Sequence, residues 1–108
     1  MSTADSEIVT LVARIRARPG CEDIVARALA EVAAAVADGE PETLGYHVCR
    51  AGDDPRQFVT FERFAHREAM EAHNGSAAVA AFVAAVDGCL AQPVEITVMR
   101  ECSALVRG

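Results

Sequence analysis

The chain has 108 residues, of which 52% are apolar, and its 16 acidic and 10 basic side chains give a formal net charge of −6. This length fits one domain with a single core and excludes a second, cofactor-binding domain. Phosphate backbones are repelled on average by an acidic protein with a sequence pI of about 4.9, so nucleic acid is excluded as an expected partner.

The cysteines and the apolar runs bear on metal binding and on location. The four cysteines have no C-x-x-C pair and no histidine at zinc-finger spacing, which indicates reduced structural thiols and no metal site: Cys21, Cys49, Cys89 and Cys102. Residues 1 to 7 lack the basic leader and apolar stretch of a signal peptide. The longest apolar run, Ala77 to Val86, is shorter than the roughly 20 residues of a membrane-spanning helix. We therefore expect a soluble, cytoplasmic protein without a membrane partner.

The first predicted elements are a strand and a long helix. Apolar and polar residues alternate from Ile8 to Ala17, which predicts a strand whose arginines at 14, 16 and 18 keep one face of a sheet edge solvated. Pro19-Gly20 ends this strand. Apolar residues at helical spacing after two acidic residues predict a helix from about Cys21 to Ala37.

Two strands joined by a turn follow. Alternation predicts one strand from Thr43 to Arg50 and another from Gln57 to Phe64, and residues 51 to 55 have the composition of a turn between antiparallel neighbours. The second of these strands places four side chains on one face: Phe58, Thr60, Glu62 and Phe64.

The last elements complete a βαββαβ order in which the second helix is broken in two. A short helix is predicted from His66, as its cap, to His73, and Ser76 is predicted to cap a longer one. The buried stripe of that longer helix is expected at Val79, Phe82, Val83 and Val86. A final strand, Val94 to Cys102, follows Pro93. The predicted fold is α+β and ferredoxin-like, with one domain over residues 1 to 108, a core from about 7 to 102 and polar tails.

This arrangement predicts a homodimer. The helices would cover only one face of an antiparallel sheet, while apolar residues occur on both sides of the first three strands. Much of the apolar content is alanine, which buries little area per residue. A face-to-face partner is the expected cover of the open face.

His73 and Glu62 are the candidate catalytic residues. Imidazole titrates near neutrality, so His73 is a candidate general base or proton relay; it would otherwise cap a helix C-terminus. A carboxylate flanked by apolar neighbours, as expected for Glu62, must be paired or have a raised pKa. Glu62 is expected to orient His73 or to bond a substrate hydroxyl, or else to pair with an arginine of a neighbouring strand.

Three further residues are candidates for substrate binding. Tyr46 offers a hydroxyl that could donate to a quinone oxygen, or it is a core aromatic with a solvated tip. Phe64 is the phenylalanine expected in a pocket, and Met70 is expected next to His73 on the short helix.

Five short pieces resemble, in their order and spacing, the antibiotic biosynthesis monooxygenase family over about Ile8 to Arg100: Pro19-Gly20, Leu44-Gly45-Tyr46, Asp54-Pro55, Glu62-Arg63-Phe64 and Ala72-His73. The resemblance implies a dimeric ferredoxin-like α+β barrel. It also implies small oxygenases that use dioxygen on quinols, anthrones or phenolic polyketides without a cofactor. Many members carry tryptophan where this chain has Phe64, and this chain has no tryptophan, so a mechanism that relies on an indole donor is not expected.

The expected function is a cofactor-independent monooxygenase acting on a small aromatic substrate. A deprotonated phenol or anthrone can itself pass an electron to dioxygen, so the protein need only bind, orient and deprotonate it in a dry pocket. The alternatives are an isomerase of the same superfamily and a non-catalytic ligand-binding or structural dimer, which gains if Glu62 and His73 lie far apart. Haem degradation is disfavoured, because it needs a tryptophan and an axial histidine at set positions. In this chain those positions fall near His73 and Val83, so the residue types do not match.

Overall fold

The computed structural model describes residues 7 to 108, so the prediction about an N-terminal leader falls mostly outside the described residues. The elements follow in the order β1 (Val9–Arg16), α2 (Glu22–Gly39), β2 (Thr43–Arg50), β3 (Gln57–Phe64), α3 (Arg67–Asn74), α4 (Ala77–Ala85) and β4 (Glu95–Arg100). Within residues 7 to 108, no helix is both long and apolar enough to cross a bilayer.

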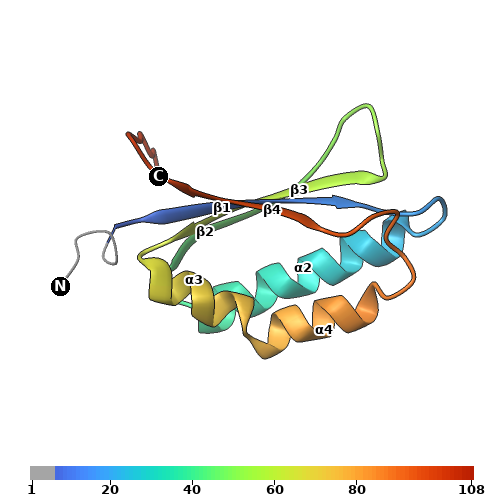
Figure 1. Cartoon of the computed structure of the whole chain (residues 1–108), viewed down its shortest axis with the longest axis horizontal. Helices are drawn as coiled ribbons and strands as arrows, with labels where there is room; N and C mark the ends of the chain where they lie inside the picture. Colours follow the sequence, from blue (N-terminus) through green and yellow to red (C-terminus); the bar gives the residue numbers. More distant parts are fainter. Residues whose placement is uncertain (1–6) are drawn as a thin grey trace.

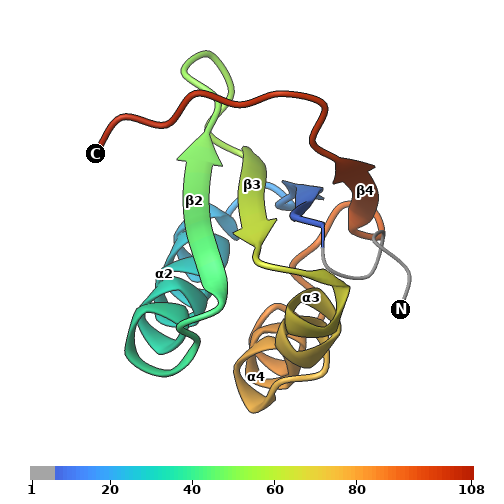
Figure 2. The ribbon, with the colours of Figure 1, turned by 90° about the vertical axis from the view of Figure 1, so that its left-hand side faces the viewer.

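The strands form one antiparallel sheet in the order β2-β3-β1-β4, and the helices cover one of its faces (Figure 1). Seen from the side, the C-terminal segment leaves β4 on the opposite face (Figure 2). This is the predicted ferredoxin-like α+β fold with a second helix divided into α3 and α4.

The helix-facing side of β1 and β3 supplies most of the core. Alternate residues of β1 are buried, and the four β3 side chains predicted to share a face are all buried. The register pairs Leu11 with Glu62 and Ala13 with Thr60, so the polar β3 residues stand among apolar ones. Period-two alternation therefore predicted this face correctly.

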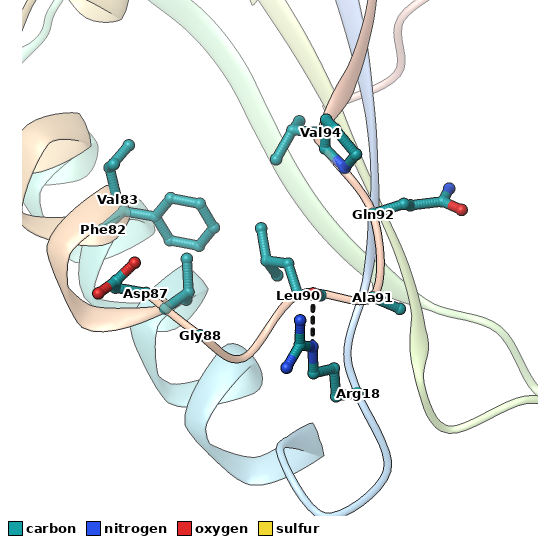
Figure 3. A pocket seen from close by; sticks show the side chains of 11 residues that line it. Arg18, Phe82, Val83, Asp87, Gly88, Leu90, Ala91, Gln92 and Val94 are labelled. Atoms are coloured by element: carbon teal, nitrogen blue, oxygen red, sulfur yellow. Dashed lines mark hydrogen bonds between the residues drawn. The ribbon is translucent and has the colours of Figure 1, made fainter.

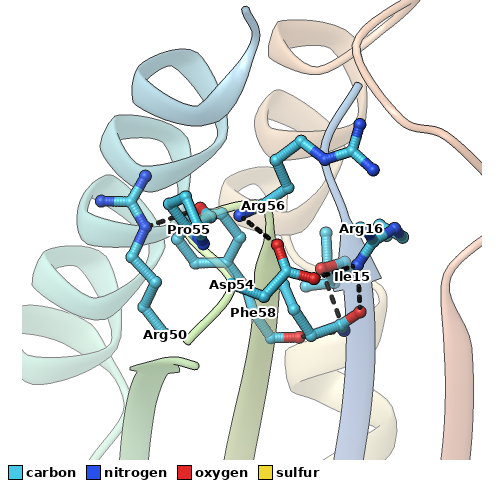
Figure 4. Close-up of polar contacts among 8 residues, drawn as sticks. Ile15, Arg16, Arg50, Asp54, Pro55, Arg56 and Phe58 are labelled. Atoms are coloured by element: carbon cyan, nitrogen blue, oxygen red, sulfur yellow. Dashed lines mark hydrogen bonds and ion pairs between the residues drawn. The ribbon is translucent and has the colours of Figure 1, made fainter. Parts of the chain in front are cut away.

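The prediction that β1 is an edge strand is wrong. β1 pairs with β3 on one side and with β4 on the other, so its arginines lie on an inner strand. Arg16 is not simply solvated: its Nη1 donates to Asp54 Oδ2 at 2.7 Å and to Gln57 Oε1 at 3.2 Å (Figure 4). The hydrogen bond from Arg16 lowers the pKa of Asp54. These contacts tie the β2–β3 turn to β1.

The helix boundaries largely follow local signals. α2 begins at Glu22, close to the predicted start, and ends at Gly39. His66 Nδ1 accepts from the Ala69 N–H at 3.1 Å, and Ser76 Oγ accepts from the Val79 N–H at 3.3 Å. Both predicted caps are confirmed.

The predicted buried stripe of α4 is wrong in part. Val83 is 62% exposed, Val79 and Phe82 are half-buried, and of the four only Val86, just after the helix, is buried. The reason is that α4 packs chiefly on α2 and not on the sheet. Because no helix covers the outer part of β4, its helix-facing residue Ile96 also stays exposed.

The four cysteines are all free thiols. Cys49 and Cys102 are exposed, whereas Cys21 and Cys89 are half-buried and their side chains hydrogen-bond each other, which raises the pKa of Cys21. Although these two residues are distant in sequence, the fold brings the start of α2 against the loop after α4. Both pack against the core.

Candidate functional site

A cavity of about 90 Å³ lies between the helix-facing side of the sheet and helices α2 and α4. Most of its wall is apolar and comes from β1, α2, α4 and the start of β4: Leu11, Ala13, Ile15, Leu29, Val32, Val79, Phe82, Val94 and Ile96. The remaining lining residues are polar: Tyr46, Thr60, Glu62, His73 and Asn74. An apolar hollow with a few convergent polar groups is the usual form of a small-molecule site.

His73 and Glu62, the two predicted catalytic residues, meet at this cavity. His73 stands in the last turn of α3 and Glu62 on the inner face of β3, and their side chains are 3% and 5% exposed. His73 Nε2 lies 3.3 Å from Glu62 Oε1. The sequence predicted both residues and their common pocket, but only the packing of α3 against β3 brings them together.

Glu62 has one oxygen that is satisfied and one that is not. Thr60 Oγ1 donates to Oε2 at 2.7 Å. Oε1 is buried, and among the described residues its one close polar contact is the 3.3 Å ion-pair contact with His73 Nε2. A buried carboxylate oxygen with only this one long contact is costly, so Oε1 keeps the capacity to accept from a further donor.

A second carboxylate, from Glu40, holds the other side of the imidazole. Its Oε1 and Oε2 lie 2.9 and 3.2 Å from His73 Nδ1. Thr43 Oγ1 donates to Oε1 at 2.7 Å and so fixes the carboxylate. The sequence reading did not single out Glu40, because it lies just after α2, 33 residues before His73, with no periodic signal of its own.

The geometry determines how many protons the three groups hold. Since a carboxylate only accepts, Nδ1 must carry a hydrogen toward Glu40. A neutral ring would then turn the Nε2 lone pair toward Glu62 Oε1, so one more proton must lie between these two atoms. Burial lowers the pKa of His73, but the Glu62 and Glu40 carboxylates outweigh it and the pKa lies above the ordinary value. This arrangement therefore favours the imidazolium form of His73 more than free solution does.

Two aromatic rings flank the imidazole. The centroids of Tyr46 and Phe64 each lie 5.4 Å from that of His73, in tilted arrangements. Burial, followed by the charges of Glu62 and Glu40, raises the pKa of Tyr46, so its hydroxyl remains a donor at neutral pH. Tyr46 lines the cavity, whereas Phe64 is fully buried against His73 and is not among the lining residues.

Met70, the third residue predicted to bind substrate, does not line this cavity. It contributes to a separate open depression with Val9, Arg67 and Met99, and it packs against the core from there. Met70 precedes His73 by three positions on α3, but this spacing does not bring it to the cavity wall.

Other hollows offer less chemistry. The depression in Figure 3, of about 490 Å³, is open and is lined by the end of α4 and the loop that leads to β4. Arg18 Nε donates to the Leu90 carbonyl there at 3.0 Å, so this cation is already engaged. Within residues 7 to 108, no group of three or more His, Cys, Asp or Glu side chains is arranged to hold a metal ion.

Fold and site together define a ferredoxin-like α+β domain with a carboxylate–imidazole pair in a small apolar cavity. The family model for antibiotic biosynthesis monooxygenases matches residues 8–85, and the chain belongs to this family. No curated protein matches it.

Several solved structures share the fold along nearly the whole chain. Rv0793 from Mycobacterium tuberculosis is 25% identical, with a TM-score of 0.84 over 93% of this chain and 100% of that one. NE2512 from Nitrosomonas europaea, a protein of unknown function, is 27% identical, with a TM-score of 0.81 over 96% and 98%. PA3566 from Pseudomonas aeruginosa is 25% identical, with a TM-score of 0.80 over 92% and 98%. These similarities establish the fold of the whole domain.

Proposed function

We propose that the protein is a cofactor-independent monooxygenase that deprotonates a small phenolic, quinol or anthrone-type substrate for reaction with dioxygen. The observation that carries this proposal is Oε1 of buried Glu62, which has only the long contact with His73 in an apolar cavity. A substrate hydroxyl or acidic C–H would supply a further donor. Family membership supports oxygenase chemistry.

In the proposed reaction, Glu62 acts as the base. The substrate O–H or C–H bond breaks, its electron pair stays on the substrate, and the proton binds Oε1. The substrate anion takes over the negative charge, next to the His73 imidazolium and the neutral Tyr46 hydroxyl. Both groups stabilise the anion more than they stabilise the neutral substrate.

Dioxygen then acts as the oxidant. The anion passes one electron to dioxygen, and the resulting radical pair combines to form a peroxide at the substrate carbon. For a carbon that carries two hydrogens, breaking the O–O bond leaves a carbonyl and releases water. One oxygen atom stays in the product, the other leaves as water with both hydrogens, and Glu62 returns its proton.

The cavity limits the substrate. Its 90 Å³ is less than the 150 Å³ or so of an engineered cavity that takes up benzene, so even one ring requires the wall to move. Val79 and Phe82 on α4 line the cavity and are only half-buried, so movement of this wall would disrupt the least packing. A one- or two-ring substrate is therefore favoured over a larger polyketide.

The test is oxygen uptake by metal-free protein with a reduced naphthoquinol. We expect a substrate-dependent rate above that of buffer, which falls in the Glu62→Gln and His73→Ala variants. A wild-type rate equal to that of buffer, across one- and two-ring quinols, contradicts the proposal.

An isomerase is the second candidate, because the same pair can remove a proton and return it to a neighbouring atom. Glu62 and His73 lie in contact, so the separation that would have favoured the ligand-binding alternative is not observed. Exchange of substrate hydrogen for solvent deuterium without oxygen consumption would favour the isomerase over the monooxygenase.

We also propose that the protein acts as a homodimer in the cytoplasm. The face of the sheet opposite the helices exposes Phe61 and Met99, which are 39% and 38% exposed, and the tail that leaves on this side exposes Leu105 and Val106. A second copy would cover these side chains. The four free thiols suit a reducing compartment.

A further inference from the structure

His73 lines two separate hollows. Its Nε2 side faces the inner cavity, and the residue also borders an outer groove of about 210 Å³ between the α2–β2 connection and α3. Glu40, Ala69, Ala72 and Ser76 line this groove as well. The imidazole thus lies between the inner cavity and a surface groove.

The two carboxylates on either side of the His73 imidazole differ in their access to water. The Glu62 side chain is 5% exposed, whereas that of Glu40 is 21% exposed. Glu40 accepts from Thr43 as well as from Nδ1, so its position is determined by two donors. The charged or titratable groups facing His73 are Glu40 from the α2–β2 connection, Glu62 from β3 and Tyr46 from β2.

We propose that Glu40 is a positioning residue of the site, and that the groove it lines is the route by which His73 exchanges its Nδ1 proton with water. The inference rests on the proposed function for its catalytic meaning, because it assumes that Glu62 and His73⁺ form the working pair. In the exchange step the Nδ1–H bond breaks and a Glu40 O–H bond forms, water takes this proton, and a proton from water returns to Nδ1 by the reverse path. The ring keeps its hydrogen on Nε2, toward Glu62.

The role of Glu40 follows from charge and orientation. A carboxylate at Nδ1 fixes the ring plane and favours the imidazolium, whose Nε2 faces Glu62. Without Glu40 the ring can lose its proton at lower pH and can rotate. His73 would then have no fixed path for proton exchange with the solvent.

The first experiment follows the His73 ring by NMR during a pH titration of the ligand-free protein. We expect Glu40→Gln to move the His73 midpoint to lower pH and Glu40→Asp to restore it in part. The matched control is Glu31→Gln, because Glu31 is an exposed carboxylate on α2 that lines neither hollow. This control should leave His73 unchanged. An unchanged His73 midpoint in folded Glu40→Gln overturns the inference, whether or not the protein consumes oxygen.

A second variant tests the groove itself. Ala72 is exposed on α3 and lines the groove, so Ala72→Leu would narrow the groove without removing a polar group. We expect slower exchange of the Nδ1 proton with water and an unchanged titration midpoint. Equal exchange rates in the wild type and this variant exclude the groove as the route.

Turnover separates this inference from the proposed function. If the wild type consumes oxygen, Glu40→Gln should lower kcat/KM about tenfold, with the alkaline limb of the profile moved to lower pH. An unaltered pH profile would contradict the role of Glu40. A wild type that consumes no oxygen would refute the monooxygenase proposal and leave the NMR result standing.

Discussion

At the scale of single residues, the site is an arrangement of two carboxylates on one imidazole. The apolar wall makes ionised groups costly, and the arrangement reduces this cost by placing His73 between Glu40 and Glu62. Glu62 Oε1 has only the long contact with His73, and Glu62 lines the cavity, so this oxygen can accept from a bound ligand. Both function and pH response should depend on this trio.

Replacing the base should separate activity from stability. Glu62→Gln keeps the size of the side chain but removes the proton acceptor, so we expect the oxygen-uptake rate to fall by a factor of about 10² to 10⁴. The Tm should fall little, because Glu40 still pairs with the His73 imidazole in this variant. The control is Gln92→Glu, because Gln92 lies in an exposed loop. Gln57 is unsuitable as a control position because it contacts Arg16. A Glu62→Gln variant with full activity would remove Glu62 from the mechanism.

The raised pKa of His73 has a defined effect on stability. A group whose pKa is higher in the folded than in the unfolded state stabilises the fold most below the unfolded value, which is 6.5 here. This contribution is lost as pH rises through the higher folded value. We expect the free energy of unfolding, measured in urea, to decrease across this window. The decrease should be smaller in Glu40→Gln than in the wild type. An equal change of the unfolding free energy with pH in both proteins would contradict this prediction.

At the scale of elements, α4 is the least firmly packed part of the cavity wall. It has nine residues, none of them fully buried, and it packs chiefly on α2. Short helices gain little from propensity alone, so the Ser76 cap and the contact with α2 must hold it. An element of this kind can move when a ligand enters.

Removal of the cap should therefore loosen one wall of the site. Ser76→Ala deletes the hydroxyl that accepts from the Val79 N–H, at a cost of about 1 kcal/mol. Hydrogen exchange should increase in α4 and not in β1 or β3. Ser103→Ala, in the exposed C-terminal segment, serves as the control. Uniform protection in both variants would show that α4 does not depend on its cap.

At the scale of the whole molecule, the helices leave one face of the sheet uncovered. This face includes exposed Phe61 beside the inner strand β1, with Val12 and His47 as cross-strand neighbours. Apolar side chains on an open sheet face gain most from a second sheet laid against them. The proposed dimer would therefore use the side of the sheet that the site does not use.

A charge on this face should prevent dimer formation. We expect light scattering to give a dimer mass for the wild type and a monomer mass for Phe61→Asp. Val83→Asp places the same charge on an exposed apolar residue of the helix layer and should remain dimeric. A monomeric wild type at micromolar concentration would contradict the proposed assembly.

The sequence by itself determined the elements, most of their boundaries, both caps and the inner face of β3, because periodicity and capping act over a few residues. It also singled out His73 and Glu62. Tertiary packing was needed to show that Glu40 contacts His73 and that β1 lies inside the sheet. It also decided that Val83 faces solvent and Met70 lies away from the cavity. These features depend on contacts between distant segments. The local sequence of one strand or helix does not specify which neighbour will cover it.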